Sequence, residues 1–271
     1  MPTLSLCICT MNRPEELTTA LQSILDGSSI PEQIIVSDDG DGSAREVAQS
    51  FAGVTYLPGP RRGLGANRNN CIAAATGDLI AFIDDDVTVD SEFVAVAKQS
   101  SVAEIITTGW ELNHSHDPAR KVSAHNASFL GFQRVAPGNH LEAICINATV
   151  FPRGLFENAL FDEQIRYGYE EIDIARHAVS LGWSIVYNDD LHVKHFPAAS
   201  NRDGYAGVLN VSRLYITHKA YRHYERNRAK AAAFNVVAAV HHLAYAVKGG
   251  HRFGEAVMTI RAARKKQRAH R

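Results

Sequence analysis

Short apolar runs alternate with amphipathic segments along the first hundred residues. The apolar runs predict strands at residues 4–10, 33–39, 54–58 and 78–86, and apolar residues at helical spacing predict helices at 14–25, 43–51, 66–76 and 91–99. A chain that alternates strand and helix in this way builds a mostly parallel sheet with helices on its faces. The pattern therefore predicts an α/β fold with a doubly wound sheet, and such sheets bind ligands at the carboxyl ends of their strands.

The pattern is less regular beyond residue 100. It predicts strands at residues 103–110 and 142–151, loops or a small β extension at 113–140, a helix ending at Gly182, and short strands at 183–188 and 191–196. After Pro197 the spacing is helical to the end of the chain, with a break near Gly249 and Gly250. We therefore divide the chain into a domain of about residues 1–200, with halves near 1–100 and 101–200, and a helical extension at 201–271.

Charge is distributed unevenly along the chain. Residues 219–271 carry 13 Lys and Arg against two acids, a balance of +11, whereas the preceding residues carry −12. A basic helical extension could lie on an anionic membrane surface, pack on the acidic body, or pack on a second copy in a homodimer. No nucleic-acid-binding motif accompanies the charge, so we do not expect nucleic acid as a partner.

Composition narrows the class of protein further. No apolar run approaches the roughly 20 residues that cross a bilayer, and Met1–Thr10 has no basic leader before its apolar run. The four cysteines lack C-x-x-C spacing and are expected to be reduced thiols. These features predict a cytoplasmic protein, either soluble or peripheral on the inner face of the membrane.

Carboxylates follow two of the predicted strands. Asp84, Asp85 and Asp86 come directly after the apolar run IAFI, and Asp38 and Asp39 end an earlier strand. Adjacent carboxylates repel one another, so their ionised form needs a cation or water nearby. Oxygen ligands of this kind suit Mg²⁺ and Mn²⁺. An Asp-rich turn without chemistry is the alternative, but the convergence of both clusters on strand ends favours a binding site.

Five motifs in order resemble those of glycosyltransferase family 2, whose members have the GT-A fold. Between about residues 4 and 196 the chain reads TMNRP, VSDDGDGS, GLGANRNNCIAAATGDLIAFIDDD, GYEEIDIARHAVSLGW and VKHF. The resemblance implies an inverting transferase that moves a sugar from a nucleotide-diphosphate sugar donor to a hydroxyl acceptor, on a glycan or a lipid-linked molecule. It also implies Mn²⁺ or Mg²⁺ as cofactor, because the diphosphate leaving group develops charge that a divalent cation neutralises.

The resemblance assigns roles to residues at the strand ends. It makes Asp86 a direct metal ligand, and it gives Asp84 or Asp85 a contact with the metal or its water, or with the ribose. The donor contacts that it implies are Thr10, Asn12, Arg13, Asp38, Asp39 and Arg68. For Arg68, which lies early in a helix, an ordinary surface arginine is the alternative. His195 matches a late histidine that some relatives use as a metal ligand; a purely structural histidine is the alternative.

The motif GYEEID is where the resemblance places the catalytic base. Inversion requires a carboxylate that accepts the proton of the attacking hydroxyl. The family usually shows Glu-Asp here, and alignment puts Glu171 at the aspartate position, with a side chain one methylene longer. We favour Glu171 over Glu170 as the base, and we expect Asp173 and Arg176 to support the same helical turn. A solvated helix N-terminus without catalytic function is the alternative.

Three other classes of protein share some of these sequence features. A sugar-phosphate nucleotidyltransferase would need a triphosphate-binding loop rich in glycine and basic residues, which TMNRPEEL does not supply. A Rossmann dehydrogenase is excluded because GLGANR lacks the third glycine and lies outside the first βα turn. A catalytically inactive sugar- or lipid-binding module would rely on the basic extension.

Trp110 could stack on a sugar or belong to the core.

Overall fold

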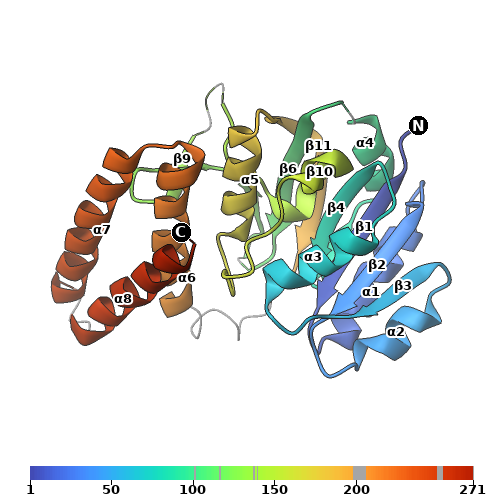
Figure 1. Cartoon of the computed structure of the whole chain (residues 1–271). Helices are drawn as coiled ribbons and strands as arrows, with labels where there is room; N and C mark the ends of the chain where they lie inside the picture. The colour runs from blue at the N-terminus through green and yellow to red at the C-terminus, as the bar shows by residue number, and fades with distance from the viewer. Residues whose placement is uncertain are drawn as a thin grey trace.

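A curved central sheet with helices on both faces stands beside a unit of three C-terminal helices (Figure 1). The computed structural model describes residues 1–100, 102–115, 117–136, 138, 140–197, 206–248 and 253–270. The helices are α1 (Pro14–Leu25), α2 (Ala44–Ser50), α3 (Leu64–Ala74), α4 (Phe93–Gln99), α5 (Glu170–Ser180), α6 (Ala206–Lys219), α7 (Arg228–Lys248) and α8 (Phe253–Ala269).

The main sheet runs in the order β3-β2-β1-β4-β10-β6-β11-β5, with β7 paired to β6. Its strands are β1 (Leu4–Thr10), β2 (Gln33–Asp38), β3 (Val54–Pro58), β4 (Leu79–Asp84), β5 (Val87–Val89), β6 (Ile105–Asn113), β7 (Arg120–Ser123), β10 (Thr149–Pro152) and β11 (Ser184–His195). A separate hairpin joins β8 (Asn126–Ala127) to β9 (Gln133–Val135). The first four strands are parallel, while β10 runs antiparallel between β4 and β6. The predicted α/β class is confirmed, and the sheet is mixed: β1–β4 and the pair β6–β11 are parallel, whereas β10, β5 and β7 pair antiparallel.

Strand β1 shows how the sequence fixes the sheet. All seven of its residues are buried, and successive side chains point to opposite faces. Leu6 and Ile8 pack in the cluster that includes Leu21 of α1, whereas Cys7 packs in the cluster that includes Cys71 of α3. Because helices cover both faces, a slip of register would exchange two well-packed surfaces. The carboxyl ends of β1 and β4 are therefore held side by side, with Cys9 opposite Asp84.

Two strand predictions for the middle segment are wrong. Most of the strand predicted at 142–151 is absent, because local bonds such as that from Thr149 Oγ1 to the Cys145 carbonyl replace ladder pairing. The two strands predicted at 183–188 and 191–196 are one strand, β11, with a register shift between Tyr187 and His192. The shift lies against Gly109, where a Cβ would stand 1.6 Å from the Leu191 carbonyl oxygen. The short strand β5 was not predicted at all.

The C-terminal helices are fastened to α5, which lies between them and the sheet (Figure 1). Lys219 of α6 donates to Asp162 and to Asp173 of α5, both at 2.7 Å, and Tyr224 donates to Asp173 at 3.0 Å. Arg176 likewise reaches Glu225 at 2.6 Å. The acid and the arginine of α5 that we expected to support their own turn therefore bind the C-terminal helices.

Two predictions for the C-terminal region cannot be compared with the described residues. The boundary predicted at residue 200 and the break near Gly249 and Gly250 fall outside the described residues. Among the helices that the structure does describe, none combines the length and the apolarity that a bilayer crossing requires.

Candidate active site

The turn after β4 directs two carboxylates toward the end of β1. Thr10 Oγ1 donates to Asp85 Oδ2 at 2.8 Å, and Arg13 Nη1 lies 3.0 Å from both Asp85 Oδ1 and Asp86 Oδ2. Burial raises the pKa of Asp85 to about 6, although Thr10 and Arg13 oppose the shift. The structure thus brings four of the predicted site residues into one hydrogen-bonded group.

His195 joins this group from β11. Its Nε2 lies 3.2 Å from Asp86 Oδ1, and its Nδ1 lies 3.0 Å from Glu111 Oε1. Burial works against a charged imidazole, but the hydrogen bonds to Asp86 and Glu111 outweigh it and raise the pKa of His195 to about 10. Burial also opposes ionisation of Asp86, yet its bonds with His195 and Arg13 hold its pKa below the ordinary value. His195 and Asp86 therefore form a charged pair, and a cation held between them would take the place of the Nε2 proton.

This arrangement fits a divalent cation held by two protein ligands. Asp86 Oδ1 and His195 Nε2 face each other, and Glu111 orients the far nitrogen of the imidazole, as carboxylates commonly do for metal-binding histidines. Within the described residues no group of three His, Cys, Asp or Glu side chains is placed to hold a metal. Water and phosphate oxygens would complete the coordination shell, as is usual for Mg²⁺. Asp84, the other predicted ligand, is turned toward Arg68.

Arg68 connects the strand-end carboxylates to α5. Its Nη2 lies 3.1 Å from Asp84 Oδ1 and its Nη1 lies 3.1 Å from Glu170 Oε1. The side chain is 1% exposed, so the alternative of an ordinary surface arginine is wrong. Burial disfavours its charge, but Asp84 and Glu170 more than compensate and raise the pKa of Arg68. One buried cation therefore bridges the predicted donor side and the predicted base side of the site.

The two glutamates of GYEEID have different environments. Glu170 is buried against Arg68, whereas Glu171 is half-buried and accepts a hydrogen bond from Gln133 Nε2 of β9 at 3.1 Å. Burial, and then the neighbouring Glu170, raise the pKa of Glu171 to about 7. Both glutamates follow Tyr169, a non-glycine residue at φ 72° that turns the chain sharply into α5. A carboxylate with a pKa near neutrality is suited to accept a proton.

The remaining predicted donor contacts hold their own loops. Asn12 Oδ1 accepts from the Asp41 amide at 2.8 Å. Asp38 is buried and accepts from the Gly40 amide at 2.7 Å. Asp39 accepts from the amides of Arg61 and Gly63, at 2.8 and 3.2 Å. Their side chains thus shape the ends of β1 and β2, and their contact with a nucleotide remains a prediction.

Sequence reasoning missed Glu111, Asn147 and Gln133. Glu111 lies in β6 and orients His195, Asn147 Oδ1 accepts from the Asp84 amide at 2.9 Å, and Gln133 holds Glu171. The sequence signal for Glu111 was an acid among the polar residues that end β6. Asn147 and Gln133 carried no signal, because their roles depend on contacts between residues more than 35 positions apart.

Trp110 lies outside this group of contacts. Its ring stacks on His192 at 4.7 Å, Lys121 lies 4.3 Å above it, and its Nε1 donates to the Asp189 carbonyl. It is a half-buried residue of the sheet surface.

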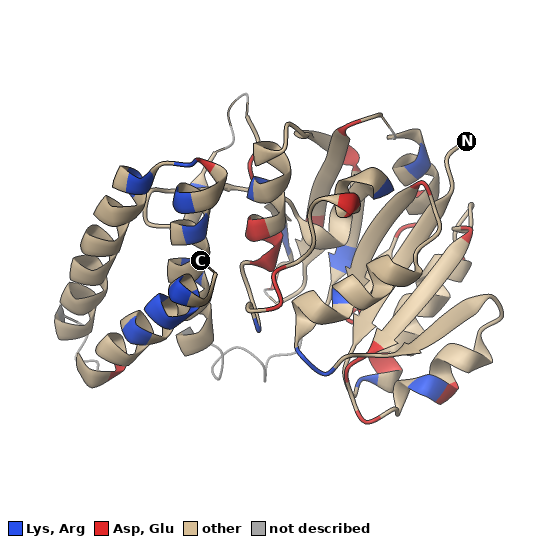
Figure 2. Ribbon diagram, in the orientation of Figure 1, with Lys and Arg blue, Asp and Glu red and all other residues tan. Residues whose placement is uncertain are grey.

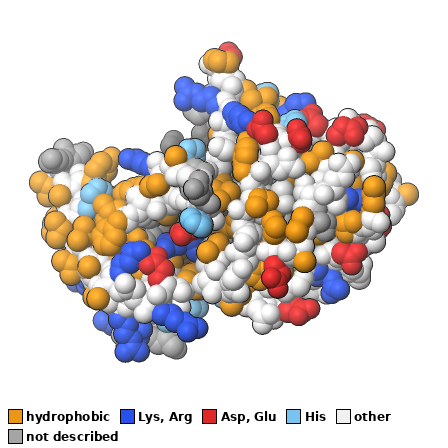
Figure 3. Space-filling view, turned by 90° about the horizontal axis from the view of Figure 1, so that it is seen from above, with side chains coloured by type: hydrophobic (Ala, Val, Ile, Leu, Met, Phe, Trp, Pro, Cys, Tyr) orange, Lys and Arg blue, Asp and Glu red, His pale blue; other side chains and the backbone are white. Residues whose placement is uncertain are grey.

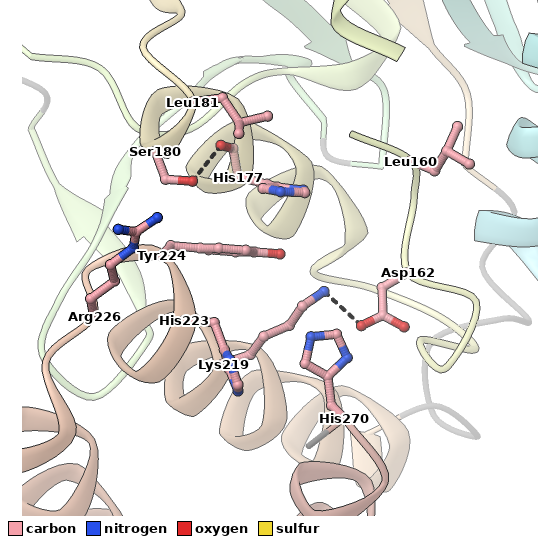
Figure 4. A pocket seen from close by; sticks show the side chains of 10 residues that line it. All are labelled: Leu160, Asp162, His177, Ser180, Leu181, Lys219, His223, Tyr224, Arg226 and His270. Atoms are coloured by element: carbon pink, nitrogen blue, oxygen red, sulfur yellow. Dashed lines mark hydrogen bonds and ion pairs between the residues drawn. The ribbon is translucent and has the colours of Figure 1, made fainter. Parts of the chain in front are cut away.

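A pocket of about 450 Å³ lies between α5 and the C-terminal helices (Figure 4). It contains none of the predicted site residues. In Figure 4, Lys219 points to Asp162 across one side, and Tyr224 lies flat beside His177, with their rings 4.7 Å apart. Its polar side chains are largely engaged in joining the two parts of the molecule, so we assign the pocket no role in the chemistry.

Residues 5–100 match the family model described as Glycosyl transferase family 2. This region of the chain belongs to glycosyltransferase family 2. Over 97 residues the chain is 32% identical to the succinoglycan biosynthesis protein ExoM of Rhizobium meliloti, covering 32% of this chain and 31% of ExoM. It is 33% identical over 97 residues to a Campylobacter jejuni protein named GalNAc(5)-diNAcBac-PP-undecaprenol beta-1,3-glucosyltransferase, covering 32% and 30%. The alignments thus span about a third of the length of these curated relatives.

Solved structures show the same fold over more of the chain. GalNAc-T7, solved with UDP, GalNAc and Mn²⁺, superposes with a TM-score of 0.68 at 15% identity, covering 83% of this chain and 49% of that one. The mannosyltransferase PcManGT of Pyrobaculum calidifontis, solved with GDP-Man and Mn²⁺, gives 0.61 at 16% identity, covering 98% and 87%. The predicted GT-A fold is confirmed by these structures, and the predicted family is supported by the match over residues 5–100.

Proposed function

We propose that this protein transfers a sugar, with inversion, from a nucleotide-diphosphate sugar donor to a hydroxyl acceptor, and that Glu171 is the base. The observation that carries the proposal is the contrast within GYEEID. Glu170 is tied to Arg68 in a buried ion pair, whereas Glu171 contacts a neutral amide and has a pKa of about 7. Glu171 is therefore the carboxylate that can take a proton from an attacking hydroxyl near neutral pH.

The donor side of the site supports the same reaction. Asp86 and His195 would hold Mn²⁺ or Mg²⁺, which supplies charge stabilisation for the departing nucleoside diphosphate. Both solved structures described above contain Mn²⁺, with UDP or with GDP-Man. Asp84 and Asp85 would lie beside the bound nucleotide, and Thr10 and Arg13 keep Asp85 and Asp86 in place.

The acceptor is expected to be a glycan or a lipid-linked molecule. The Campylobacter jejuni relative is named for a glucosyl transfer to an undecaprenol-diphosphate-linked glycan, and ExoM is named for succinoglycan biosynthesis. These names support an acceptor of that class for this chain.

Calorimetric titration tests the two halves of the proposal separately. UDP-, GDP- and dTDP-sugars are titrated into the wild-type protein with and without Mn²⁺, and the donor that binds is then used with the variants. We expect Asp86→Ala to lose the metal-dependent part of donor binding, whereas Glu171→Gln binds donor normally but loses transfer by at least about a hundredfold. Metal-independent donor binding in wild type, or unchanged binding in Asp86→Ala, would contradict the metal assignment.

A matched control removes a carboxylate outside the site. Asp90 pairs with His192 and Lys194 on the sheet surface, so Asp90→Asn should leave both donor binding and transfer unchanged.

Incubation with a nucleoside triphosphate and a sugar phosphate tests for a nucleotidyltransferase, and we expect no pyrophosphate. Full transfer by Glu171→Gln would assign the base elsewhere.

A further inference from the structure

Helix α7 presents an apolar stripe to solvent. Its inner face buries Ala231, Phe234 and Ala238, while Val236, Val240 and Val247 are 64, 62 and 70% exposed on the outer face. These three valines are spaced four and seven residues apart, so they align along one side of the helix. A soluble helix normally carries polar residues there, which makes this face unusual for a surface that contacts only water.

Apolar side chains are also exposed at the start of α8. Phe253 and Met258, in the first turns of α8, are 56 and 61% exposed. Figure 3 shows hydrophobic side chains gathered along the edge of the C-terminal helical unit. The stripe of α7 and the start of α8 thus form one outward surface, which we name the α7–α8 face.

Basic side chains adjoin this face. Arg261, Arg264, Lys265 and Arg268 of α8 are all exposed, and Glu255 is the acid on the same helix. Figure 2 shows that Lys and Arg predominate over Asp and Glu on α8, and Figure 3 shows basic side chains beside the apolar edge of the helical unit. An apolar stripe next to a cationic cluster is the combination by which helices bind in the plane of an anionic lipid surface.

We propose that the α7–α8 face docks on an anionic lipid bilayer. The valine stripe would enter the boundary between headgroups and acyl chains, and the α8 cations would lie against lipid phosphates. A second copy of the chain is a poorer occupant. A two-fold interface pairs the same patch on both copies, so the basic cluster of one copy would meet a patch that carries one acid on α8, Glu255, and no acidic cluster to neutralise it.

Two contacts connect helix α7 to the proposed base. Phe132 packs edge-on against His241 of α7, with ring centroids 5.8 Å apart, and the next residue, Gln133, holds Glu171. These contacts tie α7, the helix proposed to bind the bilayer, to the side of the site that holds Glu171. In this respect the inference extends the proposed function, but membrane binding itself requires neither donor nor catalysis.

Vesicle co-sedimentation of the full-length chain, without donor or acceptor, tests the docking. Vesicles of phosphatidylcholine alone are compared with vesicles that also contain phosphatidylglycerol. We expect binding to the anionic vesicles only, weakening as salt is raised. The pair Val236→Asp and Val240→Asp should weaken it at least about tenfold, and the pair Arg261→Gln and Arg264→Gln by about 30-fold, since each basic residue near the surface contributes about 1 kcal/mol.

The control pair Val122→Asp and Val186→Asp changes two valines of the sheet, 42 and 41% exposed, and should leave vesicle binding unchanged. Circular dichroism checks that each variant is folded. Absence of binding to anionic vesicles, or equal losses in the control pair, would overturn the proposal. So would a dimer, detected by light scattering, that only the α7 pair dissociates, because a second copy would then be the occupant. Donor titration of the α7 pair should match wild type, so the docking and the glycosyl transfer can fail independently.

Discussion

Gln133 donates a hydrogen bond from its side-chain amide to Oε1 of Glu171, over 3.1 Å. The two residues come from different elements, since Gln133 lies on β9 and Glu171 in the first turn of α5. A donor on a carboxylate stabilises the charged form and lowers the pKa. It also restricts the rotamer of the glutamate, whose side chain is one methylene longer than the aspartate usual in the family. Gln133 is therefore a positioning residue for the proposed base.

Replacing Gln133 with alanine should lower transfer by about tenfold, the effect of losing a hydrogen bond of about 1.5 kcal/mol to a charged group. Because the lost donor had favoured the carboxylate, the pKa of Glu171 should rise, and the loss should be larger below pH 7 than above it. Rate-pH profiles of wild type and Gln133→Ala measure this. The adjacent, exposed Arg134 provides the control as Arg134→Ala, whose profile should coincide with that of wild type. Coinciding profiles in all three proteins would exclude a positioning role.

The pH dependence of wild-type transfer should follow the ionisation of Glu171. A base acts in its deprotonated form, and burial raises the pKa of Glu171 to about 7. We therefore expect kcat/KM to rise with pH up to about 7 and to level off above it. The residual activity of Glu171→Gln should lack this rise, while Glu170→Asp should retain it. A rise that persists in Glu171→Gln would assign the titrating group to another residue.

The parallel half of the sheet and its site could be predicted because local signals agree there. The runs LSLCICT and LIAFID are apolar throughout, as strands buried on both faces must be, and the polar residues that follow mark their carboxyl ends. That agreement predicts Asp38, Asp39 and Asp84–Asp86 at one edge of the sheet, and the resemblance to the family adds Thr10 and Arg13. The strand predictions failed at two places where the apolar pattern carries no signal. The approach of β11 to Gly109 is a tertiary contact, and Thr149 bonds locally to the Cys145 carbonyl in competition with strand pairing.

Removing the buried Arg68 cation should destabilise the fold strongly. Arg68→Met leaves Glu170 and Asp84 without their counter-ion, and breaking a buried pair in this way reduces the free energy of unfolding by about 3–5 kcal/mol. Urea denaturation measures the change. The control is Arg62→Ala, which breaks a pair with Glu163 whose side chains are 64 and 37% exposed, and it should change stability by less than about 1 kcal/mol.

A second substitution separates the charge from the packing. In the double variant, Glu170→Gln replaces the carboxylate that Arg68→Met leaves unpaired with a neutral amide. Part of the stability lost in Arg68→Met should therefore return. Equal losses in Arg68→Met and Arg62→Ala, or no recovery in the double variant, would show that the ion pair contributes little beyond the packing of its side chains.

The attachment of the C-terminal helices to α5 should depend on Lys219. Its Nζ lies 2.7 Å from both Asp162 and Asp173, and all three side chains are nearly buried, so Lys219→Met leaves two buried carboxylates without a counter-ion. Both tryptophans, Trp110 and Trp183, lie at the sheet. Tryptophan fluorescence therefore reports unfolding of the sheet, while circular dichroism reports all the helices, of which α6–α8 hold 52 residues and α1–α5 hold 48.

In wild type we expect the two urea transitions to coincide, as they do when a protein unfolds in one cooperative step. In Lys219→Met the circular dichroism transition should begin at lower urea than the fluorescence transition, because the helices detach while the sheet is intact. The control Lys230→Met removes an exposed partner of Glu225 and should keep the transitions together. Coinciding transitions in Lys219→Met would mean that hydrophobic packing, rather than this ion-pair network, joins the two parts of the molecule.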